Sequence, residues 1–80
     1  MVFMANVIVY STPTCPWCVR ARQFLDQNNV KYTYYDVSED QDKLSEMVAK
    51  SGQMGVPVID IDGKIIVGFN EPKIRELLGL

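Results

Sequence analysis

Two cysteines separated by two residues follow directly after the first apolar run of this chain, in the segment Cys15-Pro16-Trp17-Cys18. They are the only cysteines among its 80 residues. Pro16 suits the first turn of a helix, because its missing N–H would have no partner there and its φ is already helical. The motif therefore predicts a strand, a connecting loop from Ser11 to Thr14, and a helix that begins at the cysteine pair.

The spacing of the two cysteines favours a reversible disulfide. Cys15, just ahead of the helix, faces unpaired backbone N–H groups and the positive end of the helix dipole, which favour a thiolate over a thiol. Cys18 lies one turn further along the same side, so the two sulfurs can meet. At about 100° per residue, Cys18 falls beside Ala21 and Leu25 on the apolar side of the helix. We therefore predict that Cys18 is buried and that Cys15 is exposed.

Composition narrows the class of protein. Eighty residues that are 48% hydrophobic predict one small domain spanning 1–80, with a core of its own. A net charge of −2 without a long basic run argues against a nucleic-acid binder. No apolar run approaches the roughly 20 residues of a membrane span, and the stretch from Met1 to Tyr10 lacks the charged start of a signal peptide. We therefore expect a cytoplasmic protein without a membrane segment, in which close cysteines are catalytic or metal-binding.

The rest of the chain alternates between strand and helix patterns. Strands are predicted at Val7–Tyr10, Val30–Val37, Val56–Ile61 and Lys64–Val67. Helices are predicted from Pro16 to about Asn28, from a capping box at Ser38 and Gln41 to Gly52, and from an N-cap at Asn70 to Gly79. Asp62-Gly63 between apolar runs is a strong hairpin signal, and a right-handed crossover makes the first two strands parallel. The sequence thus predicts an α/β domain with the order β-α-β-α-β-β-α and a mixed sheet.

Three segments of the chain resemble a known family. They are Tyr10 to Cys18, Gly55-Val56-Pro57 and Gly68-Phe69-Asn70-Glu71. Together with the predicted layout they resemble the thioredoxin fold, with its four-stranded mixed sheet, and in detail the glutaredoxin branch. The resemblance covers essentially the whole chain and is greatest to small bacterial glutaredoxin-like proteins with a Cys-Pro-Trp-Cys site.

The resemblance implies roles for particular residues. Cys15 and Cys18 would be catalytic, supported by Pro16, Trp17 and a cis Pro57 that packs opposite the disulfide. The residues that would hold the substrate or glutathione are Thr12, Val56, Gly68, Phe69, Asn70 and Glu71. The chain departs from the family in its glutathione region: Thr12 stands where many glutaredoxins have a lysine, and Val67 replaces the first glycine of a Gly-Gly pair. Phe69-Asn70-Glu71 only partly reproduces the acidic end of the family's motif.

The function implied is that of a dithiol–disulfide oxidoreductase that reduces protein or glutathione mixed disulfides. It would act as a monomer with no bound cofactor and no metal, and glutathione would be its reductant. One alternative is a redoxin that serves ribonucleotide reductase and is reduced by the flavin-dependent thioredoxin reductase, because Gly68-Phe69 followed closely by a proline is similar to that group.

The lack of histidines and of further cysteines limits the other functions that a cysteine pair can have, namely metal binding and hydrolysis. A zinc site needs four ligands, and the chain has no histidine and no further cysteine. Metal binding would therefore require a dimer, and a non-catalytic dimeric iron–sulfur carrier remains the alternative from a different class. A cysteine hydrolase is disfavoured because there is no imidazole base.

Overall fold

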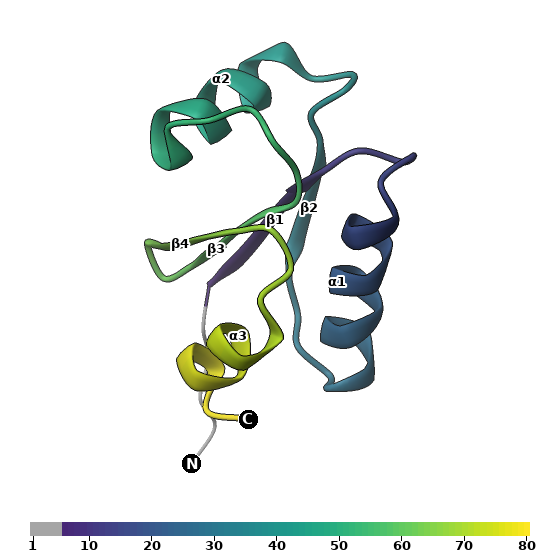
Figure 1. The fold of residues 1–80 in the computed structure, drawn as a ribbon, viewed down its shortest axis with the longest axis vertical. Coiled ribbons are helices and arrows are strands. Elements are labelled where there is room, and N and C mark those ends of the chain that lie inside the picture. Colours follow the sequence, from purple (N-terminus) through teal and green to yellow (C-terminus); the bar gives the residue numbers. More distant parts are fainter. Residues whose placement is uncertain (1–5) are drawn as a thin grey trace.

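The computed structural model describes residues 6–80 of the chain. Its strands are β1 (Val7–Ser11), β2 (Thr33–Asp36), β3 (Val58–Ile61) and β4 (Lys64–Val67). Its helices are α1 (Pro16–Gln27), α2 (Gln41–Ser51) and α3 (Glu71–Leu78). The predicted order β-α-β-α-β-β-α is confirmed (Figure 1). No helix in this described part is long and apolar enough to cross a membrane.

The four strands form one mixed sheet in the order β2-β1-β3-β4. β1 runs parallel to β2 and antiparallel to β3, and β4 pairs antiparallel with β3. Because β1 and β3 are antiparallel, with Tyr10 opposite Val58, the end of β1 and the start of β3 meet at the same edge of the sheet. This edge brings together the loop that leads to Cys15 and the segment that contains Pro57 (Figure 1).

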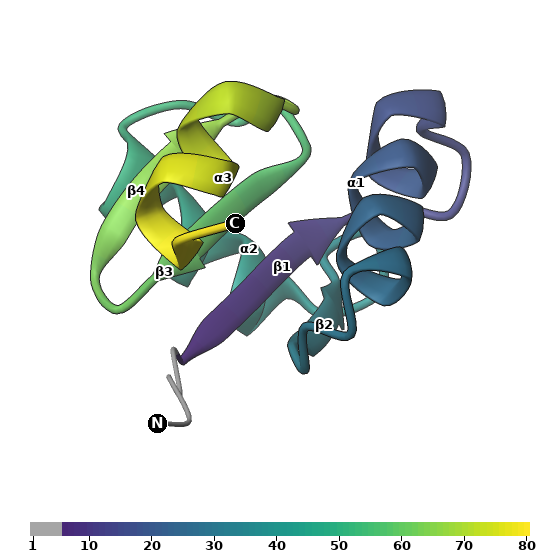
Figure 2. The ribbon, with the colours of Figure 1, turned by 90° about the horizontal axis from the view of Figure 1, so that it is seen from below.

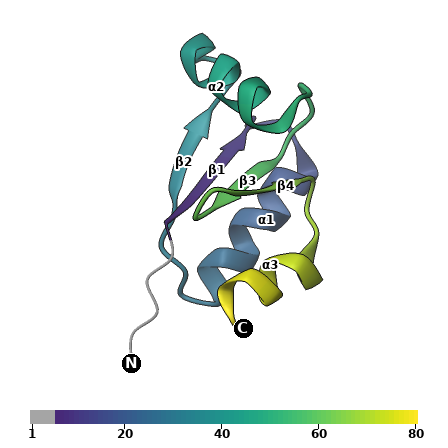
Figure 3. The same cartoon turned by 90° about the vertical axis from the view of Figure 1, so that its left-hand side faces the viewer.

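Helices cover both faces of the sheet (Figures 2 and 3). Helices α1 and α3 pack on one face, where the buried core residues are Val7, Val9, Ala21, Phe24, Leu25, Ile59, Ile61, Ile66, Ile74 and Leu78. Helix α2 packs on the other face over a smaller core of Tyr10, Val37, Met47 and Val58. Alternation along each strand sends neighbouring residues to opposite faces, so the cysteine helix and α2 are separated by the sheet.

A partly buried polar network lies under α2, with Tyr10 and Asp60 buried and Glu46 and Lys50 partly exposed. The Tyr10 hydroxyl donates to the Glu46 carboxylate, and Lys50 Nζ lies 2.8 Å from both Tyr10 Oη and Asp60 Oδ2. Asp60, itself buried, also accepts the N–H of Gly63 at 2.7 Å through its other oxygen. The bond to Asp60 raises the pKa of Lys50, and burial raises the pKa of Tyr10. The network ties α2 to β1, β3 and the hairpin that follows β3.

Four predicted strand boundaries are wrong by one to three residues, and one of them is the end of β2, which lies at Asp36 rather than Val37. Ser11 is the last residue of β1, paired with Asp36, rather than the first residue of the loop. Strand β2 begins at Thr33 rather than Val30, because the N–H of Val30 bonds the Leu25 carbonyl at 2.9 Å and holds it in the turn after α1. Strand β3 begins at Val58 rather than Val56, after the cis Pro57.

The predicted capping box at Ser38 and Gln41 is also wrong. The N-cap of α2 is Asp40, whose carboxylate accepts the N–H of Lys43 at 3.1 Å. Ser38 N–H and hydroxyl are instead directed to the carboxylate of Asp36. The other predicted caps are confirmed: Asn70 begins α3, while Gly52 and Gly79 end α2 and α3 in the left-handed conformation.

Candidate functional site

Cys15 is the N-cap of α1, and its sulfur takes the place usually held by a serine or aspartate oxygen. The backbone N–H of Cys18 donates to Cys15 Sγ across 3.2 Å, while Pro16 occupies the first turn and needs no partner. On its other side the Cys15 thiol donates to the carbonyl of Val56, with sulfur and oxygen 3.8 Å apart. The sulfur is thus held between a helix N-terminus and the segment before β3.

The two thiols differ in exposure as predicted. Cys15 is half-buried, whereas Cys18 is 1% exposed on the side of α1 that carries Ala21 and Leu25. The pKa of the Cys18 thiol is raised to about 11, first by burial and then by the neighbouring Cys15, while the Thr12 backbone and Ser11 act in the opposite direction. Cys18 is therefore a protonated thiol at neutral pH, held out of solvent behind Cys15.

Ser11 is a site residue that the sequence analysis did not identify. Its side chain is fully buried, and its hydroxyl has no hydrogen-bond partner within the described range. It lies on the α1 face of β1, beside the Cys18 thiol, whose pKa it lowers. The alternation of Val7, Val9 and Ser11 along β1 is the signal that could have placed it there.

The bond between Val56 and Pro57 is cis, which confirms the expectation drawn from the resemblance. Pro57 is fully buried, and its carbonyl accepts the N–H of Gly68 at 2.8 Å. This bond joins the second and third segments of the predicted site. The carbonyl of Val56, one residue earlier, meets the Cys15 thiol, so the first two segments meet at that sulfur and the third joins them through Pro57.

Gln53 shapes the loop that leads to Val56, and the sequence analysis missed it too. Its side-chain amide folds back on Gly55: the amide oxygen accepts the N–H of Gly55, and Nε2 donates to the Gly55 carbonyl at 3.1 Å. Nε2 also lies 3.3 Å from Ser51 Oγ, at the end of α2. This pairing fixes the backbone between α2 and β3, and a Cβ on Gly55 would lie only 2.6 Å from the Gln53 amide oxygen.

Several residues assigned to glutathione already have partners within the fold. Phe69 packs edge-on against Phe24, with ring centroids 5.7 Å apart. The Asn70 side chain caps α3 by accepting the N–H of Lys73 at 3.3 Å, and Glu71 pairs with Arg75 at 3.2 Å. The structure therefore places the third segment beside Pro57, but its polar side chains are turned to α3.

Thr12 and Trp17 flank the cysteines without binding them through their side chains. The carbonyl of Thr12 accepts the N–H of Cys15 at 3.5 Å, which closes the turn before α1. Trp17 is 56% exposed, and the guanidinium of Arg20 lies 5.4 Å from its ring centroid. The indole is therefore exposed at the surface near Cys15 in the sequence and belongs to neither core.

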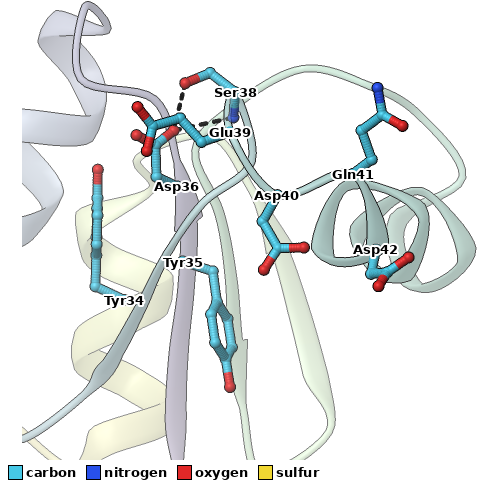
Figure 4. A pocket seen from close by; sticks show the side chains of 8 residues that line it. All are labelled: Tyr34, Tyr35, Asp36, Ser38, Glu39, Asp40, Gln41 and Asp42. Atoms are coloured by element: carbon cyan, nitrogen blue, oxygen red, sulfur yellow. Dashed lines mark hydrogen bonds between the residues drawn. The ribbon is translucent and has the colours of Figure 1, made fainter.

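A hollow of about 650 Å³ lies away from the cysteines, at the start of α2 and the edge of β2 (Figure 4). Its lining residues are Tyr34, Tyr35, Asp36, Ser38, Glu39, Asp40, Gln41 and Asp42. In the described part of the chain no three Cys, Asp or Glu side chains are arranged to hold a metal ion. The hollow is acidic, and neither cysteine lines it.

Comparison with known sequences identifies relatives over most of the chain. The sequence model of the Glutaredoxin family matches residues 7–66. An uncharacterized glutaredoxin-like 8.6 kDa protein in the rubredoxin operon of Clostridium pasteurianum is 47% identical over 70 residues, covering 88% of this chain and 93% of that protein. Glutaredoxin 3 of Escherichia coli K12 is 37% identical over 68 residues, covering 85% of this chain and 82% of the relative.

Solved structures agree with the sequence relatives. The glutaredoxin of Archaeoglobus fulgidus superposes with a TM-score of 0.83 at 32% identity, covering 92% of this chain and 86% of that chain. Methanoredoxin of Methanosarcina acetivorans gives a TM-score of 0.86 at 27% identity, covering 94% of this chain and 85% of that chain. The fold is thus the thioredoxin fold of glutaredoxins, as the resemblance implied. With its family match from residue 7 to residue 66 and its cysteine pair at the start of α1, the chain belongs to the glutaredoxin family.

Proposed function

We propose that this protein is a dithiol–disulfide oxidoreductase that reduces protein or glutathione mixed disulfides through Cys15 and Cys18. One observation carries the proposal: the Cys15 sulfur accepts the N–H of Cys18 at 3.2 Å at the N-terminus of α1, with the buried Cys18 thiol one turn behind it. Negative charge on a group in this position is stabilised by the helix N-terminus. Both cysteines belong to one helix, so a single copy of the chain suffices.

The reaction has two exchange steps. The Cys15 thiolate attacks one sulfur of the substrate disulfide, that S–S bond breaks, and the other sulfur leaves as a thiolate that takes a proton from water. Cys18 then loses its proton and attacks Cys15 Sγ, which releases the second substrate thiol and leaves a disulfide between Cys15 and Cys18. Two electrons pass to the substrate, and an external dithiol or two monothiols must return them.

The substrate chain would bind along the segment before β3. The Val56 carbonyl faces the Cys15 sulfur, and the N–H of Val56 donates to no group in the described residues. A free donor and acceptor on one residue can pair with an extended partner. Thr12 and the backbone around Gly68 would border the same segment, together with Phe69, Asn70 and Glu71.

Glutathione is the reductant in this proposal, and no cofactor is bound. The backbone N–H groups around Gly68 to Asn70 are the donors that could hold a glutathione carboxylate. The occupation of the Asn70 and Glu71 side chains within α3 favours the competing possibility, reduction by thioredoxin reductase.

The division of labour between the cysteines is tested by alkylation. We expect iodoacetamide at mildly acid pH, followed by peptide mapping, to label Cys15 well before Cys18, because only Cys15 reaches solvent. Cys15→Ser should abolish disulfide reduction, and Cys18→Ser should accumulate a stable mixed disulfide. Preferential labelling of Cys18 would contradict the assignment.

The electron donor is tested separately. The oxidised protein is assayed for turnover of a glutathione mixed disulfide with glutathione, glutathione reductase and NADPH, and in parallel with thioredoxin reductase and NADPH. Turnover in the first system supports the proposal. Turnover only in the second would make the protein a redoxin, and a coloured, iron-containing dimer on anaerobic purification with no turnover in either would make it an iron–sulfur carrier.

A further inference from the structure

Arg20 is an exposed cation on α1 that forms no ion pair within residues 6–80. All ten acidic residues of the chain fall in that range, and none of them lies in the first turn of α1. The Arg20 guanidinium instead lies over the exposed ring of Trp17, 5.4 Å from the ring centroid. Contact with a ring face leaves the N–H groups at the edge of a guanidinium available to another partner.

The position of Arg20 distinguishes it from the other seven basic residues. Four of these pair with carboxylates, namely Lys43, Lys50, Lys73 and Arg75. Arg22 is half-buried against the ring of Tyr34, 4.3 Å from the ring centroid. Lys31 and Lys64 also lack an ion pair in the described part of the chain, but they lie near the start of β2 and of β4, at the edge of the sheet opposite to the cysteines. Arg20 is thus the exposed, unpaired cation on the helix that carries the cysteines.

Helix geometry brings the guanidinium toward the cysteine end of α1. Side chains on a helix lean toward its N-terminus, and the Arg20 guanidinium accordingly lies over Trp17, one turn closer to Cys15. Trp17 follows Cys15 by two residues, which is about 3 Å along a helix axis. Arg20 is about 200° around the helix from the buried Cys18. The pair of Trp17 and Arg20, which we name the cationic platform, therefore lies on the solvent side of the helix end that begins at Cys15.

The cationic platform is suited to bind a carboxylate. A guanidinium can donate two parallel hydrogen bonds to the two oxygens of a carboxylate. Packing on the Trp17 ring restricts the long Arg20 side chain, which reduces the entropy that is lost when a partner binds. An extended substrate chain advances about 3.3 Å per residue, so a side chain one to three residues from a cysteine bound to Cys15 can reach the platform. An acidic side chain is complementary to the platform, and a basic one is not.

We infer that the cationic platform favours protein disulfides that carry an acidic residue one to three residues from the reacting cysteine. This inference rests on the proposed function and names its substrate class. The bonds exchanged are those given above: the Cys15–Cys18 disulfide forms, the peptide disulfide breaks into two thiols, and two electrons pass to the peptide. Arg20 takes no part in these exchanges and acts on the choice of substrate.

The test is single-turnover reduction by the pre-reduced protein, quenched with acid and quantified by chromatography. The substrates are three symmetric peptide disulfides with glutamate, glutamine or lysine at the second residue on each side of the cysteine, and oxidised glutathione as a small acidic disulfide. Each rate is divided by the rate with dithiothreitol, which removes differences in intrinsic reactivity. We expect the glutamate peptide to react about twofold to fivefold faster than the glutamine peptide at low salt, and the lysine peptide to be slowest. The difference should shrink at high salt, because salt screens exposed charges.

Variants link the preference to Arg20. Arg20→Gln should give the glutamate and glutamine peptides equal corrected rates, Arg20→Glu should reverse their order, and Arg20→Lys should retain part of the preference. A general change in the reactivity of Cys15 cancels, because the readout is a ratio between substrates. Lys64→Gln is the matched control, since it removes one positive charge from an exposed residue at the opposite edge of the sheet. It should leave the ratio unchanged.

The outcomes separate the inference from the proposed function. Equal corrected rates for the glutamate and glutamine peptides, or a preference that survives Arg20→Gln, would overturn the inference. A dependence on Arg20 confined to oxidised glutathione would overturn it as well, because Arg20 would then serve a small anion rather than a protein segment. Bis(2-hydroxyethyl) disulfide, which is small and uncharged, serves as the reference substrate. If it is reduced without any peptide preference, only the inference fails, and if no disulfide is reduced, the proposed function fails as well.

Discussion

The backbone N–H of Cys18 donates to the sulfur of Cys15, but the side chain of the same residue is buried and holds its proton. Cys18 therefore donates a hydrogen bond to the Cys15 sulfur through its backbone, while its own side chain stays a protonated thiol. Since burial raises the pKa of the Cys18 thiol to about 11, the second exchange step of the proposed reaction would depend on a deprotonation that is rare at neutral pH.

The first prediction is that release of the second thiol accelerates with pH. Burial persists in the mixed disulfide on Cys15, and thiolate is the attacking species, so the rate should rise about tenfold per pH unit from about pH 6 to about pH 9. Stopped-flow absorbance with a substoichiometric aromatic disulfide reports both released thiols. Cys18→Ser should give only the first release, and a second phase that is flat over this range would refute the prediction.

The second prediction concerns the buried hydroxyl of Ser11. Because that hydroxyl lowers the pKa of Cys18, Ser11→Ala should slow the second release by about threefold to tenfold at neutral pH. While Cys18 is a neutral thiol, the Ser11 hydroxyl has no hydrogen-bond partner in the described residues, so the same change removes an unpaired buried polar group and the free energy of unfolding should rise by about 1 kcal/mol.

In Ser11→Ala, a slower second release together with a higher free energy of unfolding would distinguish an effect on the Cys18 pKa from a purely structural role of Ser11. The rate comes from the stopped-flow assay and the stability from urea denaturation. Ser11→Thr keeps a hydroxyl and should restore the rate. If Ser11→Ala lowers stability and rate together, Ser11 acts through packing alone.

The third prediction concerns the Gln53 amide that pairs with Gly55. Gln53→Ala removes both bonds to the loop and should raise KM for a peptide disulfide by about threefold to tenfold with little change in kcat. The rate of Cys15 alkylation should stay the same, because the contacts around that sulfur from α1 are intact. Gln23→Ala, on the exposed side of α1, is the control. A fall in kcat alone would speak against a positioning role.

The fourth prediction concerns the ion pair between Lys50 and Asp60, whose nitrogen and oxygen are 2.8 Å apart. Asp60→Asn should lower the free energy of unfolding by about 1–3 kcal/mol, because Asp60 is buried and its charge is paired. Glu76→Gln breaks the exposed pair with Lys73 and should cost less than about 1 kcal/mol. Urea denaturation at pH 7 measures the free energy of unfolding of both variants. Equal decreases would show that the Lys50–Asp60 pair stabilises the fold no more than the exposed Lys73–Glu76 pair does.

The sequence predicted the fold and the cysteines because those signals are local. The order of strands and helices follows from hydrophobic periodicity, and the exposure of Cys15 and Cys18 follows from helical spacing. The cis bond before Pro57 could be expected only through the resemblance, since most bonds before proline are trans.

The remaining site residues depend on contacts between distant segments. Ser11 matters because its hydroxyl lies beside the Cys18 thiol, a contact between β1 and α1 that the strand pattern alone does not reveal. Gln53 is one of several polar residues in a loop until its amide is seen folded onto Gly55. Asp40 replaces Ser38 as a cap because Asp36 binds Ser38, a competition between neighbouring polar side chains that periodicity does not address.

The antiparallel register of β1 and β3, with Tyr10 opposite Val58, determines how Val56 lies relative to Cys15. A two-residue slip would carry Val56 about 7 Å along β1, far outside the 3.8 Å that now separates its oxygen from the Cys15 sulfur. A one-residue slip would turn Asp60 toward the apolar core beneath α1. A slipped register would therefore either bury the Asp60 carboxylate in an apolar core or separate Val56 from Cys15. The arrangement around Cys15 thus depends on the correct pairing of β1 with β3.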